Sequence, residues 1–219
     1  MDETTKSKLY WGELERRAVQ GRGIDIGCGP DPVTADARRF DVEDGDANRI
    51  SDFVREQFDF VYSSHCLEHM HDPKSTILEW WKLVKQGGFL FILVPDEDLY
   101  EQGVFPSRFN PDHKATFTIS KAKSWSPKSI NVLDLARSLP DGELVSLELQ
   151  DRGYDRSLLS NGPRRRPVLA KGCSKILKGM GLWKKSYVRR MFLPYYAVDQ
   201  TASGENVLAQ IQLIVRKVA

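Results

Sequence analysis

The chain has 219 residues, of which 41% are hydrophobic and 28% charged, values typical of one globular domain, so we expect a single domain over residues 1–219. Three cysteines without a Cys-x-x-Cys spacing exclude a disulfide framework and a zinc ribbon. The longest apolar run is too short to span a bilayer, and the first twenty residues lack the hydrophobic core of a signal peptide, so we expect a cytoplasmic protein.

The N-terminal third of the chain alternates helix-like and strand-like segments. Residues 5–19 have the apolar spacing of a short amphipathic helix, and Gly21 and Gly23 end it. Three apolar runs then predict strands at residues 23–26, 38–42 and 58–63. Such alternation indicates an α/β fold.

The clearest helix begins at Asp72, which can cap it, and at Pro73, which suits the first helical position. Its apolar stripe is expected to end at Gly87 and Gly88. The continuous apolar run Phe89–Val94 follows at once. Runs of this kind are typical of strands in parallel sheets that helices cover on both faces.

The second half of the chain has a weaker pattern. Residues 96–126 show no period and contain Gly, Pro and Asn, so we interpret them as a substrate loop or lid. Residues 130–139 are expected to be helical, and residues 144–149 and 208–215 to be strands. Residues 156–198 are interpreted as a basic amphipathic extension, or an insertion before the last strand.

A glycine-rich turn, Asp25-Ile-Gly-Cys-Gly29, follows the first strand. Open α/β sheets bind ligands at the carboxyl ends of their strands, where such a turn leaves bare backbone. A dinucleotide fingerprint would need glycine at position 32, where Pro32 stands, and no Gly-Lys-Ser/Thr follows as in a P-loop. The turn therefore favours a nucleoside ligand that carries no phosphate groups.

Two acidic positions downstream fit a nucleoside. Asp41, at the end of the second strand, offers paired acceptor oxygens for the hydroxyls of a ribose. Asp46, followed by Ala47, can accept a hydrogen bond from an adenine amino group. Each acid alone is a common loop residue, but a strand, a glycine turn and two acids in this order are much rarer.

Six segments in this order resemble the class I S-adenosylmethionine-dependent methyltransferases, specifically the small bacterial ones with a Leu-Glu-His block. These segments are Asp25–Gly29, Asp41, Gly45–Ala47, Phe58–His65, Leu67–His69 and Leu83–Pro95. The resemblance implies a Rossmann-like α/β fold, a mostly parallel seven-stranded sheet with an antiparallel last strand, and S-adenosylmethionine as cofactor. Asp31 replaces the usual third glycine and the next connection is short, so the first helix is expected to be reduced to a loop.

The resemblance also implies where the cofactor binds. The glycine turn would face its amino-acid end, Asp41 its ribose, and Asp46 and Ala47 its adenine, while Ser63 to His65 would lie below the sulfonium. The full expected set is Asp25, Gly27, Cys28, Gly29, Asp41, Asp46, Ala47, Ser63, Ser64 and His65.

The histidines are the natural candidates for a general base, because the pKa of imidazole lies near working pH. His113, beside Asp112 in the long loop, is the first choice, and His65 at the switch region of the sheet is the second. His69, together with Glu68, is interpreted as structural, and His71 as exposed. No ligand spacing in this region requires a metal ion, so none is predicted.

Residues 156–198 contain eleven Lys or Arg and no Asp or Glu, so the rest of this +2 chain carries −9. Between residues 164 and 193, basic and apolar side chains alternate at helical spacing, with Trp183 and Tyr187 among them. The pattern fits peripheral contact with an anionic membrane, or binding of a phosphate-bearing acceptor. The alternative is a helix that packs on the sheet. No base-stacking or groove-reading motif accompanies the charge, which disfavours nucleic acid.

The expected activity is transfer of a methyl group to a hydroxyl or amine of a small molecule. The basic segment and the resemblance favour a sugar of a glycan, or its precursor, as the acceptor. The alternative from another class is a regulatory protein that binds the nucleoside without turnover.

Overall fold

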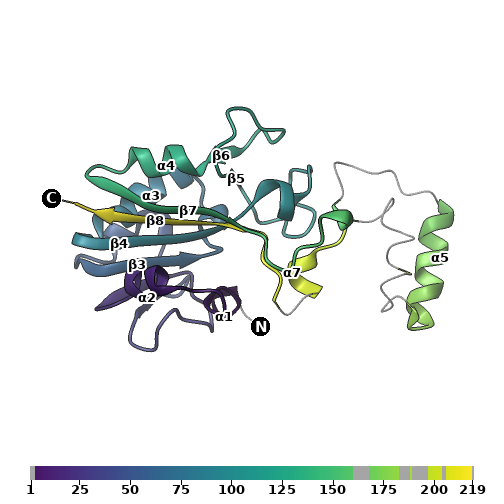
Figure 1. Cartoon of the computed structure of the whole chain (residues 1–219), viewed down its shortest axis with the longest axis horizontal. Coiled ribbons are helices and arrows are strands. Elements are labelled where there is room, and N and C mark those ends of the chain that lie inside the picture. Colours follow the sequence, from purple (N-terminus) through teal and green to yellow (C-terminus); the bar gives the residue numbers. More distant parts are fainter. Residues whose placement is uncertain (1–2, 160–167, 183–187, 189–196, 204–205, 219) are drawn as a thin grey trace.

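The computed structural model describes residues 3–159, 168–182, 188, 197–203 and 206–218. Its main sheet has six strands in the order β2-β1-β3-β4-β8-β7 (Figure 1). Their bounds are β1 Gly23–Ile26, β2 Arg38–Phe40, β3 Phe58–Ser64, β4 Val84–Pro95, β7 Gly142–Gln150 and β8 Gln210–Lys217. Strands β2, β1, β3 and β4 are parallel, and β8 is antiparallel to its neighbours β4 and β7. The antiparallel last strand is confirmed.

The sheet has one strand fewer than the resemblance implied. None of residues 41–57 forms a strand, and they contain instead the 3-10 helix η1, Ala47–Asp52. The side chain of Asp46 caps this helix by accepting from the backbone N–H of Asn48, while Ile50 is buried beneath it. Strand β2 therefore forms the edge of the sheet.

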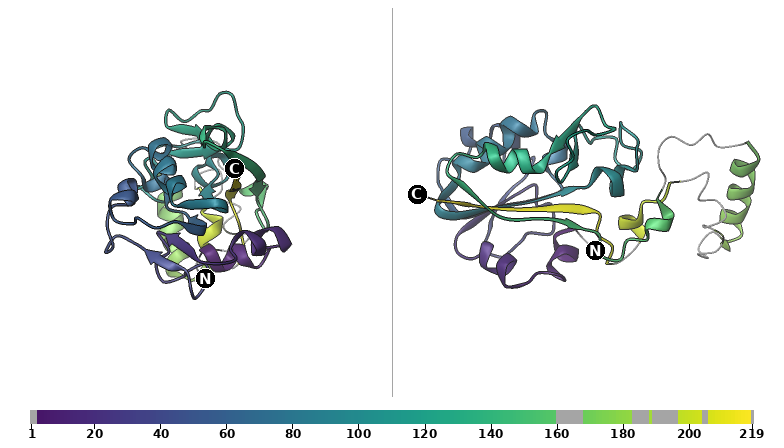
Figure 2. Two further views of the ribbon diagram at one scale, coloured as in Figure 1. Left: turned by 90° about the vertical axis from the view of Figure 1, so that its left-hand side faces the viewer. Right: turned by 45° about the horizontal axis from the view of Figure 1, so that its top comes forward.

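Two apolar cores cover the two faces of the sheet, because alternate residues of each strand point to opposite sides. The helices α3 (Pro73–Lys82) and α4 (Val132–Ser138) lie on one face, and α2 (Glu13–Ala18) lies on the other (Figures 1 and 2). In β3, for example, Val61 contributes to the first core, and its neighbours Phe60 and Tyr62 to the second.

Two helix boundaries differ from the sequence prediction. Residues 5–19 form two helices, α1 (Glu3–Lys8) and α2, because the extended backbone of Gly12 separates them. Helix α3 is capped by Asp72 as expected, but it ends at Lys82, and β4 already includes Gly87 and Gly88. Those glycines end no helix. Residues 27–37 contain no helix, which confirms the predicted loop.

Residues 96–126 have more structure than the pattern indicated. They contain the π-helix η3 (Glu97–Glu101) and the strand β5 (Thr116–Thr118), which pairs with β6 (Ser129–Asn131). The buried carboxylate of Glu97 accepts hydrogen bonds from three hydroxyl groups and one ammonium group of this region. The donors are Thr116, Lys121, Ser124 and Ser129.

The C-terminal part contains η4 (Arg156–Leu158), α5 (Val168–Gly179) and α7 (Gln200–Ser203). Helix α5 lies beyond the end of the sheet rather than on its face (Figures 1 and 2). Of the described apolar side chains in this segment, Ile176 and Met180 in α5 are 64% and 65% exposed, whereas Val188 is buried. Trp183 and Tyr187 lie outside the described residues. Among the described helices, none combines the length and apolar character needed to cross a membrane.

Candidate active site

The chain turns sharply where β1 ends. Gly27 has a φ of +74°, and a Cβ at this position would lie 2.6 Å from Sγ of Cys66. Only glycine accommodates both the backbone conformation and the close approach. The backbone N–H of Gly27 donates to the carbonyl oxygen of Phe40 at 2.8 Å, which ties the turn to the end of β2. The strand end therefore presents backbone without a side chain.

Asp41 follows β2 and braces the same turn. Its Oδ2 accepts from the backbone N–H of Gly29 at 2.7 Å, and its Oδ1 accepts from the backbone N–H of Val42 at 2.8 Å. Each carboxylate oxygen can accept two hydrogen bonds, so both oxygens keep capacity for the hydroxyls of a sugar.

Asp46 and Ala47 are fixed beside this turn. Oδ1 of Asp46 accepts from the side-chain amide and the backbone N–H of Asn48 at 2.7 and 2.9 Å, and these bonds lower the pKa of Asp46. The carbonyl oxygen of Ala47 accepts from the indole N–H of Trp80 in α3 at 2.9 Å. The segment is thus held by its own cap and by the helix packed against it.

These residues line a cavity of about 720 Å³ at the carboxyl ends of the parallel strands. Cavities of roughly 300–1,000 Å³ are typical of cofactor and small-molecule sites. Four of the expected cofactor residues line it: Gly27, Asp41, Asp46 and Ala47. The remaining lining residues are Phe40, Val42, Gly45, Cys66, His69, Met70, Asp112 and Lys114.

The other expected cofactor residues, Cys28, Gly29, Ser64 and His65 among them, do not line this cavity. The hydroxyl of Ser63 donates to the carbonyl oxygen of Ile26 at 2.9 Å, so it links β3 to β1. Asp25 is fully buried, and its Oδ2 accepts from the backbone N–H of Val33 at 2.6 Å. Burial raises the pKa of Asp25 to about 7.

His65 stands at the end of β3 with a φ of +54°. Its Nε2 lies 2.9 Å from Oε1 of Gln210, and its Nδ1 lies 3.5 Å from Oε1 of Glu68. Burial lowers the pKa of His65, but the carboxylates of Glu68 and Glu3 outweigh burial and raise it to about 9. His65 is therefore cationic at neutral pH.

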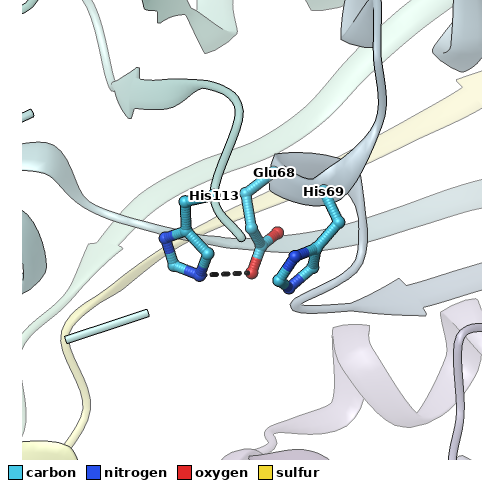
Figure 3. A group of neighbouring side chains, drawn as sticks. All are labelled: Glu68, His69 and His113. Atoms are coloured by element: carbon cyan, nitrogen blue, oxygen red, sulfur yellow. Dashed lines mark ion pairs between the residues drawn. The ribbon is translucent and has the colours of Figure 1, made fainter. Parts of the chain in front are cut away.

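The Leu-Glu-His block forms the short 3-10 helix η2, Leu67–His69. The loop of residues 96–126 docks on it, because the backbone N–H groups of Lys114 and Ala115 donate to the carbonyl oxygen of Glu68 at 2.8 and 3.3 Å. This docking brings Nε2 of His113 to 3.9 Å from Oε1 of Glu68 (Figure 3).

The expected catalytic residues meet here, but in a different pairing. Asp112 does not bind its neighbour His113; its Oδ2 lies 2.8 Å from Nδ1 of His69. The partner of His113 is Glu101, whose Oε1 lies 2.7 Å from Nδ1. The ring of Tyr100 stacks on His113 with centroids 5.3 Å apart. His113 is thus held on two sides.

A second, smaller cavity of about 250 Å³ adjoins these histidines. It is lined by Glu3, His65, Glu68, His69, Tyr100, Asn110, His113, Asp199, Thr201 and Ala202. His69 lines both cavities, so the two spaces meet at this side chain.

Sequence reasoning missed several of these residues. Glu101 and Cys66 carried no signal, because the partner of each is set by folding rather than by spacing along the chain. Glu68 was grouped with His69 as structural, yet it is the fully buried centre of the histidine group.

Comparisons with known proteins agree with this geometry. Residues 13–92 match the family model described as a methyltransferase domain. The fold is similar to that of the YcgJ protein of Bacillus subtilis, at a TM-score of 0.50 and 13% identity over 98% of this chain and 99% of that one. It is also similar to a Galdieria sulphuraria protein described as a sarcosine dimethylglycine methyltransferase, at a TM-score of 0.51 and 13% identity over 98% and 84% of the two chains. No curated sequence matches.

In the six-stranded sheet with its antiparallel β8, the glycine turn after β1 lies beside the larger cavity. Residues 13–92 therefore match a methyltransferase domain, and the chain has the fold of the class I S-adenosylmethionine-dependent methyltransferases.

Proposed function

We propose that the enzyme methylates a hydroxyl or amine of a small-molecule acceptor bound in the smaller cavity. The observation that carries this proposal is the position of His69, which lines both the cofactor-sized cavity and the histidine-rich one. Methyl transfer requires the acceptor atom and the methyl carbon to be held in line about 3–3.5 Å apart. Two adjoining cavities could hold the acceptor atom and the methyl carbon in this geometry.

S-Adenosylmethionine supplies a methyl group on a sulfonium, and the transfer leaves S-adenosylhomocysteine and one proton from the acceptor. Within the proposal His113 takes that proton at Nε2. The carboxylate of Glu101, 2.7 Å from Nδ1, favours the tautomer with the proton on Nδ1 and stabilises the imidazolium that forms. His65 is the second candidate, but its raised pKa favours the protonated ring at neutral pH, and a protonated ring cannot accept the proton.

Gly27, Asp41, Asp46 and Ala47 are the residues proposed to hold the cofactor. Asp41 would accept from the ribose hydroxyls, and Asp46 from the adenine amino group. Ser63 and Asp25 would act indirectly, by fixing β1 and the turn behind the cavity.

A sugar hydroxyl of a glycan, or of its phosphate-bearing precursor, is the acceptor class that we propose. The support is the basic segment from Arg156 to Val198, whose charge suits an anionic molecule or an anionic membrane. Within α5, the exposed apolar residues Ile176 and Met180 are close in sequence to the exposed Lys175, a combination typical of helices that lie on anionic membranes. The three free cysteines fit the cytoplasmic side of a bacterial membrane.

The test is a methyl-transfer assay with radiolabelled S-adenosylmethionine and panels of sugar phosphates, lipid-linked sugars and amines. We expect product with a hydroxyl or amine acceptor and a loss of at least about a hundredfold in His113→Ala, the scale of a lost general base. Normal turnover in that variant would move the proton-accepting role to His65. Product formed only on nucleic acid would contradict the acceptor class.

A further inference from the structure

Three side chains beside the acceptor cavity form a set of metal ligands. We propose that Glu68, His69 and His113 bind a divalent transition-metal ion, with Zn²⁺ as the ion that they match best. One ligand atom from each side chain lies within 4.8 Å of the others. Figure 3 shows the carboxylate of Glu68 between the two imidazole rings.

The carboxylate of Glu68 provides an independent observation. This residue is 0% exposed, and neither of its oxygens has a hydrogen-bond partner among the described residues. Its nearest cationic group, Nδ1 of His65, lies 3.5 Å away, at the outer limit of hydrogen bonding. The ion pair with His65 leaves both oxygens of this buried carboxylate without a hydrogen bond, so they keep acceptor positions for a cation beside His69 and His113.

Both histidines are oriented as metal ligands are. Glu101 lies 2.7 Å from Nδ1 of His113, and Asp112 lies 2.8 Å from Nδ1 of His69. In metal sites the ligating imidazole usually donates its other N–H to a carboxylate, which fixes the tautomer and the ring. Here both pairs leave Nε2 as the atom available for a metal.

The ligand set favours zinc over magnesium. Two imidazoles and one carboxylate are an established zinc set, whereas magnesium prefers oxygen ligands. Zinc bonds of about 2.0–2.2 Å place neighbouring ligand atoms about 3.3–3.5 Å apart. Nε2 of His113 and Oε1 of Glu68, at 3.9 Å, would move closer by about half an ångström.

The consequence for the reaction rests on the proposed function. A hydroxyl bound to a divalent ion gives up its proton more readily, so with the ion bound the proton would pass to solvent water rather than to a histidine base. With the ion bound, Nε2 of His113 is a ligand and takes no proton. Chelation therefore separates the two roles of His113, since it abolishes metal-assisted transfer and leaves transfer by an imidazole base intact.

The test is calorimetric titration of the full chain with Zn²⁺ and, separately, Mg²⁺, without S-adenosylmethionine. We expect one Zn²⁺ per chain and no heat from Mg²⁺. Glu68→Gln, which keeps the side-chain shape, and His69→Ala should each weaken zinc binding at least about tenfold. His71→Ala removes an exposed histidine outside the group, and Cys173→Ser removes an exposed thiol, so both controls should bind zinc normally.

Absence of zinc binding, or equal affinity in Glu68→Gln and His69→Ala, would overturn the site; circular dichroism establishes that these variants are folded. Methyl transfer is measured separately, with and without a chelator. Transfer by a chain that binds no zinc would overturn the metal site alone. Zinc binding by a chain that methylates no acceptor would overturn the proposed function alone.

Discussion

Nδ1 of His113 lies 2.7 Å from Oε1 of Glu101, and both side chains are almost completely buried. They are twelve residues apart, at the C-terminal end of η3 and in the loop that docks on η2. The contact fixes the ring of His113 and directs its Nε2 towards Glu68. The same geometry serves an imidazole base and a metal ligand.

The Glu101→Gln variant tests this contact. The amide keeps the size of the side chain but removes the negative charge that stabilises an imidazolium or strengthens an imidazole ligand. We expect turnover to fall about 10–100-fold with unchanged affinity for S-adenosylmethionine, and the pH–rate profile to shift. Equal loss of cofactor binding would indicate a change in folding instead.

Asp41→Asn tests the ribose assignment. The amide oxygen can still accept from the backbone N–H of Gly29, but one of the paired acceptors for the sugar is lost. We expect S-adenosylhomocysteine to bind about 1–3 kcal/mol more weakly, measured by calorimetry. Asp36→Asn, at an exposed position, is the matched control. Wild-type affinity in Asp41→Asn would refute the assignment.

Gly27→Ala and Gly29→Ala form a matched pair. Both glycines have positive φ, at +74° and +52°, but an added Cβ meets Sγ of Cys66 at 2.6 Å only at position 27. Backbone strain of about 1–3 kcal/mol is common to both variants, so the difference between them reports the clash. We expect Gly27→Ala to have the lower melting temperature and the weaker cofactor binding. Equal effects would mean that Cys66 moves away freely.

Asp25 predicts a pH dependence of stability. Burial raises the pKa of its carboxyl from 3.8 to about 7, so the folded chain keeps a proton that the unfolded chain loses above about pH 4. The folded state is therefore stabilised by this group below pH 4, and that stabilisation is lost as the pH rises to 7. The shift corresponds to about 4 kcal/mol.

Urea unfolding at pH 5 and pH 8 measures this effect. Asp25→Asn, whose side chain stays neutral, should lose less stability between the two pH values than the unmodified chain. Asp134→Asn, at an exposed position, should behave like the unmodified chain. If the Asp25 variant showed the same pH dependence of stability as the unmodified chain, a group other than Asp25 would be its cause.

Much of the cofactor half of the molecule was predictable, because local patterns determine it. β1 has the expected bounds, and Asp72 caps α3 as expected, since strand runs and caps depend on neighbouring residues. The missing strand was harder to foresee. The segment of residues 41–57 is short, and its cap at Asp46 favours a 3-10 helix. The family resemblance implied a seventh strand instead.

The histidine group was only partly predictable. The sequence pointed to His113 and Asp112 as a pair, since they are adjacent, but adjacent side chains in a loop point in different directions. Their actual partners, Glu101 and His69, are set by the docking of the loop on η2. That docking uses backbone hydrogen bonds, which leave no mark on the sequence.

Helix α5 leads to the last prediction, which concerns an anionic membrane. Ile176 and Met180 are exposed, and the surrounding segment is strongly basic. The double variant Ile176→Glu/Met180→Glu places two carboxylates on the apolar stripe, where they oppose both insertion and the negative surface.

Sedimentation with vesicles measures the effect. We expect the unmodified chain to sediment with vesicles containing phosphatidylserine at low salt and to stay in solution with phosphatidylcholine alone. The double variant should sediment at least about tenfold less, since each basic group contributes about 1 kcal/mol near such a surface and the apolar anchor is lost as well. Leu9→Glu, at an apolar residue exposed elsewhere, is the matched control. Equal sedimentation of the double variant and the control would assign α5 to acceptor binding instead of membrane contact.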